Sequence, residues 1–192
     1  YSFEKKLRVK FFIVDHRLRP ESKKEAKIVR QALNKFKIKA QILTWKGKKP
    51  GSNIQSLARK ERFRLLFKKC EKYKINNILL GHHESDLVEN FFIRMLRGSG
   101  LNGLVSLGKK NEIGNFNLLR PLLDQKKENL KYLSKHIFGF YIEDPSNNDE
   151  KYKRIRIRNL IDELEKEGLD RKKLLTTINN LKSSNQVISF YV

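Results

Sequence analysis

The sequence has almost no cysteine, no long hydrophobic run and few acidic residues. Its single cysteine, Cys70, excludes an internal disulfide framework and a zinc site made of several cysteines. It contains no run of about 18 apolar residues, the length that a membrane span needs. Its first residues, Tyr1–Lys6, lack the apolar segment of a secretory signal peptide. We therefore expect a cytoplasmic protein that does not enter a membrane.

Three common motifs are also missing. The sequence has no G-x-x-x-x-G-K-[ST] loop, no G-x-G-x-x-G turn and no G-x-S-x-G nucleophile elbow. Histidines are scarce as well, because His82 and His83 are accompanied only by His16 and His136. Adjacent histidines do not easily chelate one ion, so we expect no metal site made of protein side chains. A histidine pair at a strand end can instead contact phosphate or act as an acid.

Basic residues are abundant. The 192 residues include 43 Lys and Arg against 21 Asp and Glu, a formal net charge of +22. This excess predicts a polyanionic partner, with nucleic acid favoured over an anionic membrane surface. The length suits one globular domain with the start of a second. Because the chain begins with Tyr1 rather than methionine, we expect a fragment of a longer protein.

Apolar runs alternate with amphipathic segments along the first half of the chain. This alternation predicts an α/β fold with a Rossmann-like, doubly wound parallel sheet over residues 1–150 and a helical extension over 151–192. The expected strands are 7–14, 40–45 and 75–80, and the expected helices are 22–36, 53–73, 84–97, 125–137, 153–167 and 171–183. Residues 101–123 are expected to be loop and short extended pieces, and the last six residues a strand or a frayed end.

Turn and cap residues mark several of these boundaries. Ser22 with Glu25 predicts a capping box, and Asn53 and Asp124 are expected to cap the helices that follow them. In a doubly wound sheet, ligands bind beyond the carboxyl ends of the strands. We therefore expect functional residues at Asp15-His16, in the loop after Trp45 and at Gly81-His82-His83.

The helix over 84–97 has two distinct faces. Its apolar face is expected to pack on the sheet, and only Ile93 breaks the division between the faces. The polar face comprises Asp86, Glu89, Asn90, Arg94 and Arg97. Two interpretations stay open: a solvated face with ordinary ion pairs, or a functional face with two carboxylates near the strand end.

Two basic segments are candidates for RNA contact. Residues 151–158 contain five basic residues and one tyrosine, and their Arg/Ile alternation fits a helix or a strand. The helix over 53–73 adds further cations. Such runs are often only solvated faces, but with the net charge and the aromatic residue they also suit RNA. The candidate RNA contacts are Arg59, Arg62, Lys151, Lys153 and Arg156.

Several segments, taken in order, resemble the tRNA(Ile)-lysidine synthetase family of the PP-loop ATP-pyrophosphatase superfamily. The resemblance spans about residues 9–160. The matching segments are Val14–Ser22, Gln55, Ala58-Arg59, Arg62-Phe63, Leu65-Leu66, Gly81–Glu89, Arg94–Leu101, Arg120–Leu123, Asp144–Asn147 and Arg154–Arg158.

The sequence departs from the family pattern at several points. The family's S-G-G-x-D-S nucleotide loop and first strand belong before residue 8 and are absent from this sequence. Where the family has x-D-D-Q-x-E-T, this chain keeps Asp86 and Glu89. The departures are Ser85, Leu87 and Asn90 in that motif and Ile155, which replaces an Asn, in the later basic motif.

The resemblance implies an adenine nucleotide alpha hydrolase-like fold and a two-step reaction. ATP, with Mg²⁺ held mostly by phosphates, adenylates the C2 carbonyl oxygen of the wobble cytidine in tRNA(Ile) with a CAU anticodon. The amine of free L-lysine then displaces AMP. The implied lysine-binding residues are Asp86, Glu89, Arg154 and Arg158, the implied catalytic residues are Asp86, Glu89, Arg94 and Arg97, and the implied nucleotide contacts are Asp15, His16, Arg19, His82 and His83.

Two other functions stay open. One is a non-catalytic RNA-binding module that has kept the fold without the ATP loop. The other is a related PP-loop tRNA thiolase, which is disfavoured because enzymes of that kind generally need more cysteines than Cys70. A homodimer is also left open.

Overall fold

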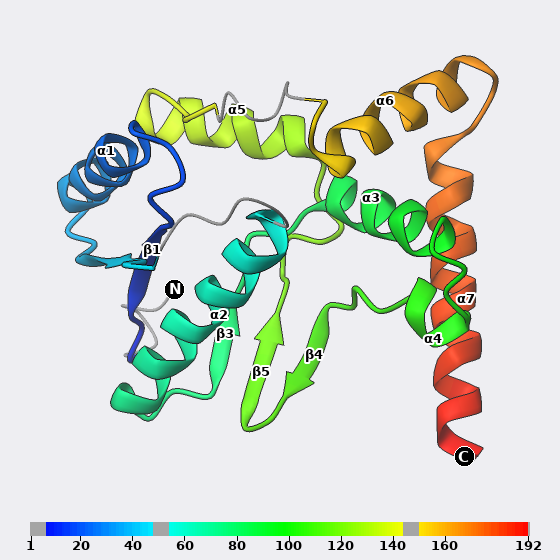
Figure 1. Cartoon of the computed structure of the whole chain (residues 1–192), viewed down its shortest axis with the longest axis horizontal. Coiled ribbons are helices and arrows are strands. Elements are labelled where there is room, and N and C mark those ends of the chain that lie inside the picture. Colours follow the sequence, from blue (N-terminus) through cyan, green and yellow to red (C-terminus); the bar gives the residue numbers. More distant parts are fainter. Residues whose placement is uncertain (1–6, 48–53, 144–149, 192) are drawn as a thin grey trace. The chain divides into compact units, whose positions relative to one another are not determined.

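The computed structural model describes residues 7–47, 54–143 and 150–191 (Figure 1). The chain divides into two compact units, residues 1–76 and 77–192. Among the described residues, no helix combines the length and the apolar character needed to cross a membrane. The expected division into a domain of residues 1–150 and a helical extension of 151–192 stays a prediction.

The first unit is a β-α-β motif followed by a long helix. Strand β1 (Phe11–Asp15) pairs in parallel with β2 (Ala40–Thr44), and helix α1 (Ser22–Lys35) joins them and packs on both. Helix α2 (Ile54–Tyr73) packs on β1. This arrangement confirms the predicted strand-helix-strand order. The buried apolar residues of this unit are Ala26, Leu43, Trp45, Phe63, Leu66 and Cys70.

The second unit contains a three-stranded sheet in the order β3-β5-β4. Strand β3 (Asn77–Leu79) is parallel to β5 (Phe116–Leu119), as an α/β fold requires, whereas β4 (Lys110–Ile113) is antiparallel to β5. The turn between β4 and β5 contains Gly114, whose φ of 55° favours glycine. The sequence predicted only short extended pieces here, because two four-residue strands carry little periodicity.

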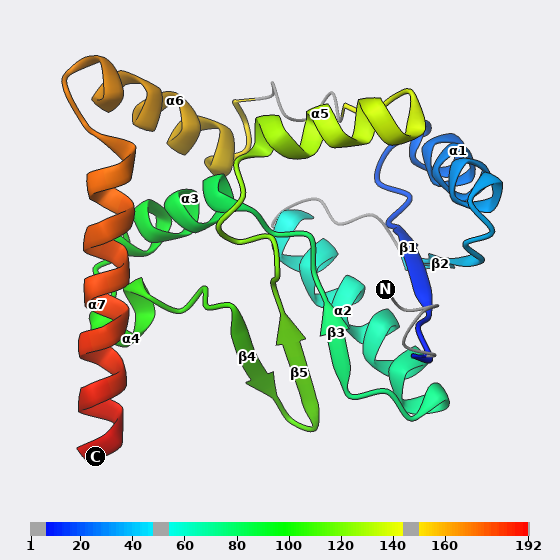
Figure 2. The ribbon, with the colours of Figure 1, turned by 180° about the vertical axis from the view of Figure 1, so that it is seen from behind.

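The described residues of the second unit also form five helices. They are α3 (Glu84–Met95), α4 (Leu101–Leu104), α5 (Lys127–Phe138), α6 (Lys153–Lys166) and α7 (Arg171–Tyr191). In both views of the ribbon, α7 runs past α3 and α4 (Figures 1 and 2), and α7 is in contact with α4. The short α4 was not predicted, and the segment 153–158 is helical rather than extended.

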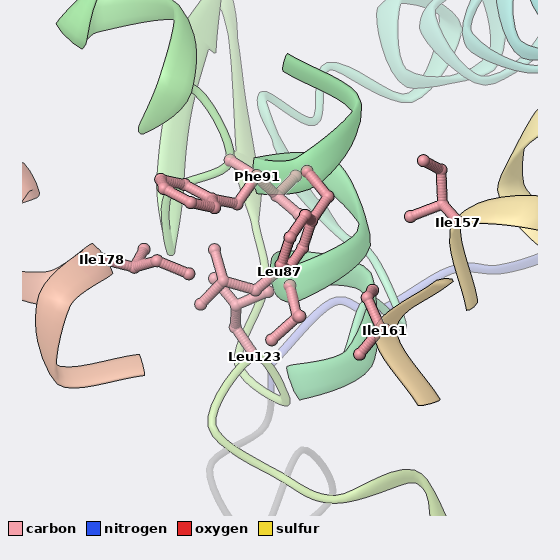
Figure 3. Close-up of a cluster of buried hydrophobic side chains, with 9 residues drawn as sticks. Leu87, Phe91, Leu123, Ile157, Ile161 and Ile178 are labelled. Atoms are coloured by element: carbon pink, nitrogen blue, oxygen red, sulfur yellow. The ribbon is translucent and has the colours of Figure 1, made fainter. Parts of the chain in front are cut away.

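The hydrophobic cluster of this unit is built mainly from helices α3, α6 and α7, and none of its buried members comes from a strand. Leu87 and Phe91 of α3 point toward Ile161 of α6 and Ile178 of α7, with Leu123 beside them (Figure 3). The prediction that the apolar face of α3 packs on the sheet is therefore wrong for this cluster. The periodicity of α3 defined the face, but it could not identify the covering element. The buried members are Leu87, Val88, Phe91, Phe92, Leu107, Leu123, Ile157, Ile161 and Ile178.

Several predicted boundaries and caps are corrected. The hydroxyl of Ser22 donates to Asp15 Oδ1 at 2.8 Å instead of forming a capping box, and Glu25 pairs with Arg19 at 3.0 Å. Asp124 does not cap α5, since the N-cap is Lys126 and Asp124 is paired with Lys109. These polar side chains bind other side chains instead of the free backbone groups at the ends of helices.

Other ends also differ from the prediction. Residues 7–10 are exposed and precede β1, and β3 is shorter than the expected strand over 75–80. Helix α3 ends at Met95, so Met95 and Leu96 are exposed and not packed. Helix α7 continues to Tyr191 because no glycine or proline interrupts it, and the expected strand or frayed end is wrong. The expected cap Asn53 and the turn 144–147 lie outside the described residues.

Candidate active site

Two buried carboxylates on α3 face two arginines on α6. Glu89 is 1% exposed and accepts a hydrogen bond from Arg158 Nε, with an N–O distance of 2.5 Å. Asp86, one turn earlier, is 9% exposed and lies 3.7 Å from Arg154 Nη1. Arg154 Nε also approaches Glu89 Oε2 to 4.0 Å. The polar face of α3 is therefore covered by α6, and the interpretation of a simple solvated face is wrong for these two carboxylates.

Helix α6 presents its arginines to α3 because its apolar residues fix its rotation. Ile157 and Ile161 are 4% and 3% exposed and belong to the helical core. Arg154 and Arg158 are four residues apart, so they share one face of the helix. Their side chains are 37% and 29% exposed, which leaves both guanidinium groups within reach of a ligand.

Asp86 also fixes the start of α3. Its Oδ2 accepts a hydrogen bond from the backbone N–H of His83 at 3.0 Å, and His83 Nε2 lies 3.5 Å from the same oxygen. A carboxylate in the first helical turn also complements the positive end of the helix dipole. One carboxylate oxygen of Asp86 therefore accepts a hydrogen bond at the start of α3, and the other faces Arg154.

A cavity of about 180 Å³ adjoins the Glu89–Arg158 pair. Its wall carries both signs of charge, which suits a small ligand with a cationic and an anionic end. The cavity is lined by Ser85, Val88, Glu89, Lys127, Glu128, Arg158, Ile161, Asp162 and Arg171, from α3, α5, α6 and α7.

His82 follows β3 and is held by a buried arginine. Arg120 is 3% exposed, and its Nε donates to His82 Nδ1 at 3.1 Å. In the sequence, Arg120 was part of a matching segment and carried no predicted role. The sequence shows only an arginine after the apolar residues Leu118 and Leu119, because burial is a property of the folded chain. Arginine is almost never buried without partners.

In the first unit, the end of β1 forms a tight polar turn. Asp15 is 4% exposed, and its Oδ1 accepts the backbone N–H of Arg17 at 2.9 Å. Arg17 itself has a φ of 51°, a left-handed conformation that this hydrogen bond supports. The role of Asp15 in the structure is therefore to hold the loop.

An open cavity of about 480 Å³ lies beside this turn, and three of the residues that line it are basic. Its lining is Arg17, Leu18, Arg19, Pro20, Ser22 and Lys23. Beside the turn, burial lowers the pKa of His16 below its ordinary 6.5, the Arg62 guanidinium lowers it further, and Asp15 partly opposes both. The neutral imidazole is therefore favoured.

The PP-loop domain model matches residues 1–164 of the chain. The chain belongs to the PP-loop domain family. This assignment confirms the predicted α/β fold class and the family resemblance. A solved PP-loop structure agrees: the U34-tRNA thiolase NcsA from Methanococcus maripaludis, with its 4Fe-4S cluster, superposes with a TM-score of 0.70 at 16% identity. That match covers 90% of this chain and 60% of the thiolase, and at this identity it shows the fold alone.

Relatives of this PP-loop domain are named tRNA(Ile)-lysidine synthase. The protein from Orientia tsutsugamushi (strain Boryong) is 42% identical over 77% of this chain and 33% of its own length. The proteins from Bradyrhizobium sp. strain BTAi1 and Wolbachia pipientis wMel are each 34% identical, over 91% and 93% of this chain and 49% and 42% of their own lengths. The chain thus spans between one third and one half of these relatives.

Arg94 and Arg97 of the PP-loop domain are not gathered with the carboxylates. Asp86 and Arg94 are eight positions apart, which is about 12 Å of helical rise, and Arg97 lies beyond the end of α3. Their predicted role in stabilising negative charge stays untested. The four residues share a face of the helix without sharing a level along it.

The predicted RNA contacts have differing surroundings. Arg59 and Arg62 of α2 both lie over the ring of Phe63, at 5.1 and 5.4 Å from its centroid. Arg156 donates to the backbone carbonyls of Glu150 and Lys151 at 2.7 and 3.2 Å, so it fixes the turn before α6. Lys153 is partly buried and Lys151 exposed.

Neither a metal cluster nor a reactive thiol is found in the part of the chain that the structure describes. No group of three or more His, Cys, Asp or Glu residues there is placed to hold a metal ion. Cys70 is buried, and burial raises the pKa of its thiol, with Glu71 adding to the effect. A thiol in these surroundings stays protonated and is a poor nucleophile.

Proposed function

We propose that this PP-loop domain is the catalytic part of a ligase that joins L-lysine to C2 of the wobble cytidine of tRNA(Ile) with a CAU anticodon, forming lysidine. The names of the relatives support this proposal. The structural observation that carries it is the Asp86/Glu89–Arg154/Arg158 cluster beside a small cavity of mixed charge. Free lysine has two ammonium groups and one carboxylate, and the cluster offers the complementary charges.

Lysine binding can proceed by an exchange of ion-pair partners. In the present structure, the carboxylate of Glu89 is compensated by Arg158. A zwitterion entering between them pairs its ammonium with the carboxylate and its carboxylate with the guanidinium. The total charge of the site changes only by the second ammonium of lysine, which Asp86 can compensate. The bidentate geometry of arginine suits the ligand carboxylate.

The chemistry that we propose has two steps. The C2 oxygen of the cytidine attacks the α-phosphorus of ATP, releasing pyrophosphate and leaving an adenylated base. The neutral ε-amine of lysine then attacks C2, AMP leaves with the C2 oxygen, and the amine gives up a proton. Holding the amine beside Asp86 or Glu89 orients the nucleophile and gives the proton an acceptor.

ATP and Mg²⁺ belong to the same proposal. The basic lining of the 480 Å³ cavity fits a polyphosphate, and Mg²⁺ would be held mostly by the phosphates of the nucleotide. Asp15, His16 and Arg19, and separately His82 and His83, remain proposed nucleotide contacts. Arg94 and Arg97 remain proposed to stabilise the adenylate and the leaving phosphate.

The decisive experiment measures lysine incorporation by the complete gene product. Purified protein, ATP, Mg²⁺ and radiolabelled lysine are combined with a tRNA(Ile) transcript carrying CAU, and with a matched transcript carrying UAU. We expect ATP-dependent label in the CAU transcript alone. Binding of the transcript without any incorporation would instead support the non-catalytic RNA-binding module.

Asp86→Asn tests the assigned site. We expect the KM for lysine to rise about tenfold or more, because an ion pair to the ammonium is lost, while the KM for ATP changes by less than about twofold. Glu163→Gln, at an exposed position of α6, is the matched control. An unchanged KM for lysine in Asp86→Asn would remove Asp86 from the lysine site.

A further inference from the structure

Arg120 is a buried cation at the centre of a hydrogen-bond network in the second unit. It follows β5 directly, and its backbone N–H donates to the carbonyl of Lys109 at 2.8 Å. Its side chain belongs to the most buried charged groups of the described residues, at 3% exposure. Burying a guanidinium is costly unless hydrogen bonds compensate it, so its partners indicate what it does.

The network fixes the direction of the guanidinium. Nη1 donates to the carbonyl of Gly108 at 2.8 Å and to Asn111 Oδ1 at 2.5 Å. The amide of Asn111 is oriented in turn, because its Nδ2 donates to the carbonyl of Ser106 at 3.2 Å. Asn111 lies on β4, the antiparallel strand that sequence analysis did not predict. One use of this strand is therefore to hold Arg120.

A further contact of Arg120 determines the state of a histidine. Arg120 Nε donates to Nδ1 of His82 at 3.1 Å. A guanidinium carries five N–H donors and no acceptor, and it stays charged throughout the accessible pH range. His82 Nδ1 must therefore carry a lone pair, so the ring is neutral and its proton is on Nε2.

We propose that Arg120 is a positioning residue that holds His82 in the neutral Nε2–H form, so that the ring offers one fixed donor to a phosphoryl oxygen of the nucleotide. The assignment of the acceptor rests on the proposed function, whereas the state of the ring rests on the network alone. His82 lies beyond the carboxyl end of β3, where nucleotides bind in α/β folds. A neutral donor fixed in this way needs no reorientation when the ligand arrives.

The state of the ring is tested directly by NMR. In the complete gene product with ¹⁵N-labelled histidine, long-range proton–nitrogen correlations distinguish Nδ1–H from Nε2–H, and His82→Gln identifies the signal of residue 82. We expect a pure Nε2–H pattern for His82 near neutral pH. A mixed pattern, an Nδ1–H pattern or a charged ring in the unmodified protein overturns the proposal, and only the assignment of the signal depends on a variant.

Arg120→Met tests whether Arg120 fixes the ring form of His82. We expect His82 to become a mixture of ring forms, because the donor at Nδ1 is gone, while Arg64→Met, which removes an exposed arginine paired with Glu61, leaves the pattern unchanged. A pure Nε2–H pattern in folded Arg120→Met would show that Arg120 does not fix the ring. Thermal unfolding of each variant establishes that it is folded.

Two substitutions of His82 test the phosphoryl contact by ATP binding. The amide of Gln reaches near the Nε2 position and that of Asn near the Nδ1 position. We expect His82→Gln to keep ATP affinity within about threefold and His82→Asn to lose about tenfold, the value of a hydrogen bond to a charged acceptor. Equal losses would overturn the donor role. Failure of the unmodified protein to bind ATP would overturn the proposed function, whereas the ring pattern would still decide the role of Arg120.

Discussion

At the residue scale, Glu89 is the most deeply buried charged residue of the candidate site. It is 1% exposed, and its Oε1 is bound by Arg158 from a helix 69 residues away in sequence. A buried charge of this kind is tolerated only with a partner, and removal of either partner leaves the other uncompensated. The same pair borders the cavity, so stability and ligand binding depend on the same atoms.

Glu89→Gln is expected to destabilise the chain as well as to weaken lysine binding. The loss should be about 2 kcal/mol, below the range for a fully buried pair because the Arg158 side chain is 29% exposed. Urea unfolding measures this difference, with Glu163→Gln as the isosteric control. A variant as stable as the control would show that the pair contributes nothing net to folding.

His16 gives the first unit a pH dependence. Its pKa is lowered in the folded chain, chiefly by burial and then by Arg62, so below pH 6.5 the unfolded state binds more protons. The free energy of unfolding should therefore fall as the pH decreases from about 6.5 to about 5. This fall should be shallower in His16→Gln and unchanged in the control His136→Gln, an exposed histidine. Equal slopes in the two variants would contradict the assignment.

At the scale of elements, α3 is the central helix of the second unit. One of its faces packs its apolar side chains against α6 and α7, and another directs its carboxylates to the arginines of α6. Because Ile157 and Ile161 anchor α6 in the core, the positions of Arg154 and Arg158 depend on apolar packing. Packing therefore supports the geometry of the charged site.

Ile178→Ala tests how far α7 is part of this packing. Ile178 is 0% exposed, and its truncation should cost about 3 kcal/mol through lost burial and a residual cavity. Ile188→Ala on the same helix is the control, since Ile188 is 52% exposed and should change stability by less than about 0.5 kcal/mol. Chemical denaturation of both variants provides the comparison. Equal losses would show that α7 is not held through Ile178.

At the scale of the whole molecule, the net charge of +22 suits a large polyanion. Two groups of lysines differ in their surroundings along the chain. Lys110 and Lys131 each form an ion pair with a carboxylate, of Glu112 and Glu143 respectively. The predicted RNA contacts Lys151 and Lys153 lie in a segment, 151–158, that contains five basic residues. Several cations so close in sequence can contact one polyanion together.

The salt dependence of tRNA binding distinguishes these two groups. Neutralising Lys151 and Lys153 together by Gln should make the slope of log K against log salt shallower by about 1.5, because each phosphate contact releases close to one counterion. The double variant Lys110→Gln with Lys131→Gln removes the same charge and should leave the slope almost unchanged. Identical slopes for both double variants would exclude Lys151 and Lys153 as phosphate contacts.

The sequence by itself determined the α/β class, the family, most of the helices and the placing of Asp86 and Glu89 on one side of α3. Each of these depends on local periodicity or on motif order, which a linear chain displays directly. Only the tertiary structure decided that α6 covers those carboxylates. It also decided that Ser22 and Asp124 bind other side chains instead of capping helices, and that Arg120 donates a hydrogen bond to His82. Burial and pairing join residues that are tens of positions apart, and periodicity defines a face without specifying which element will pack against it.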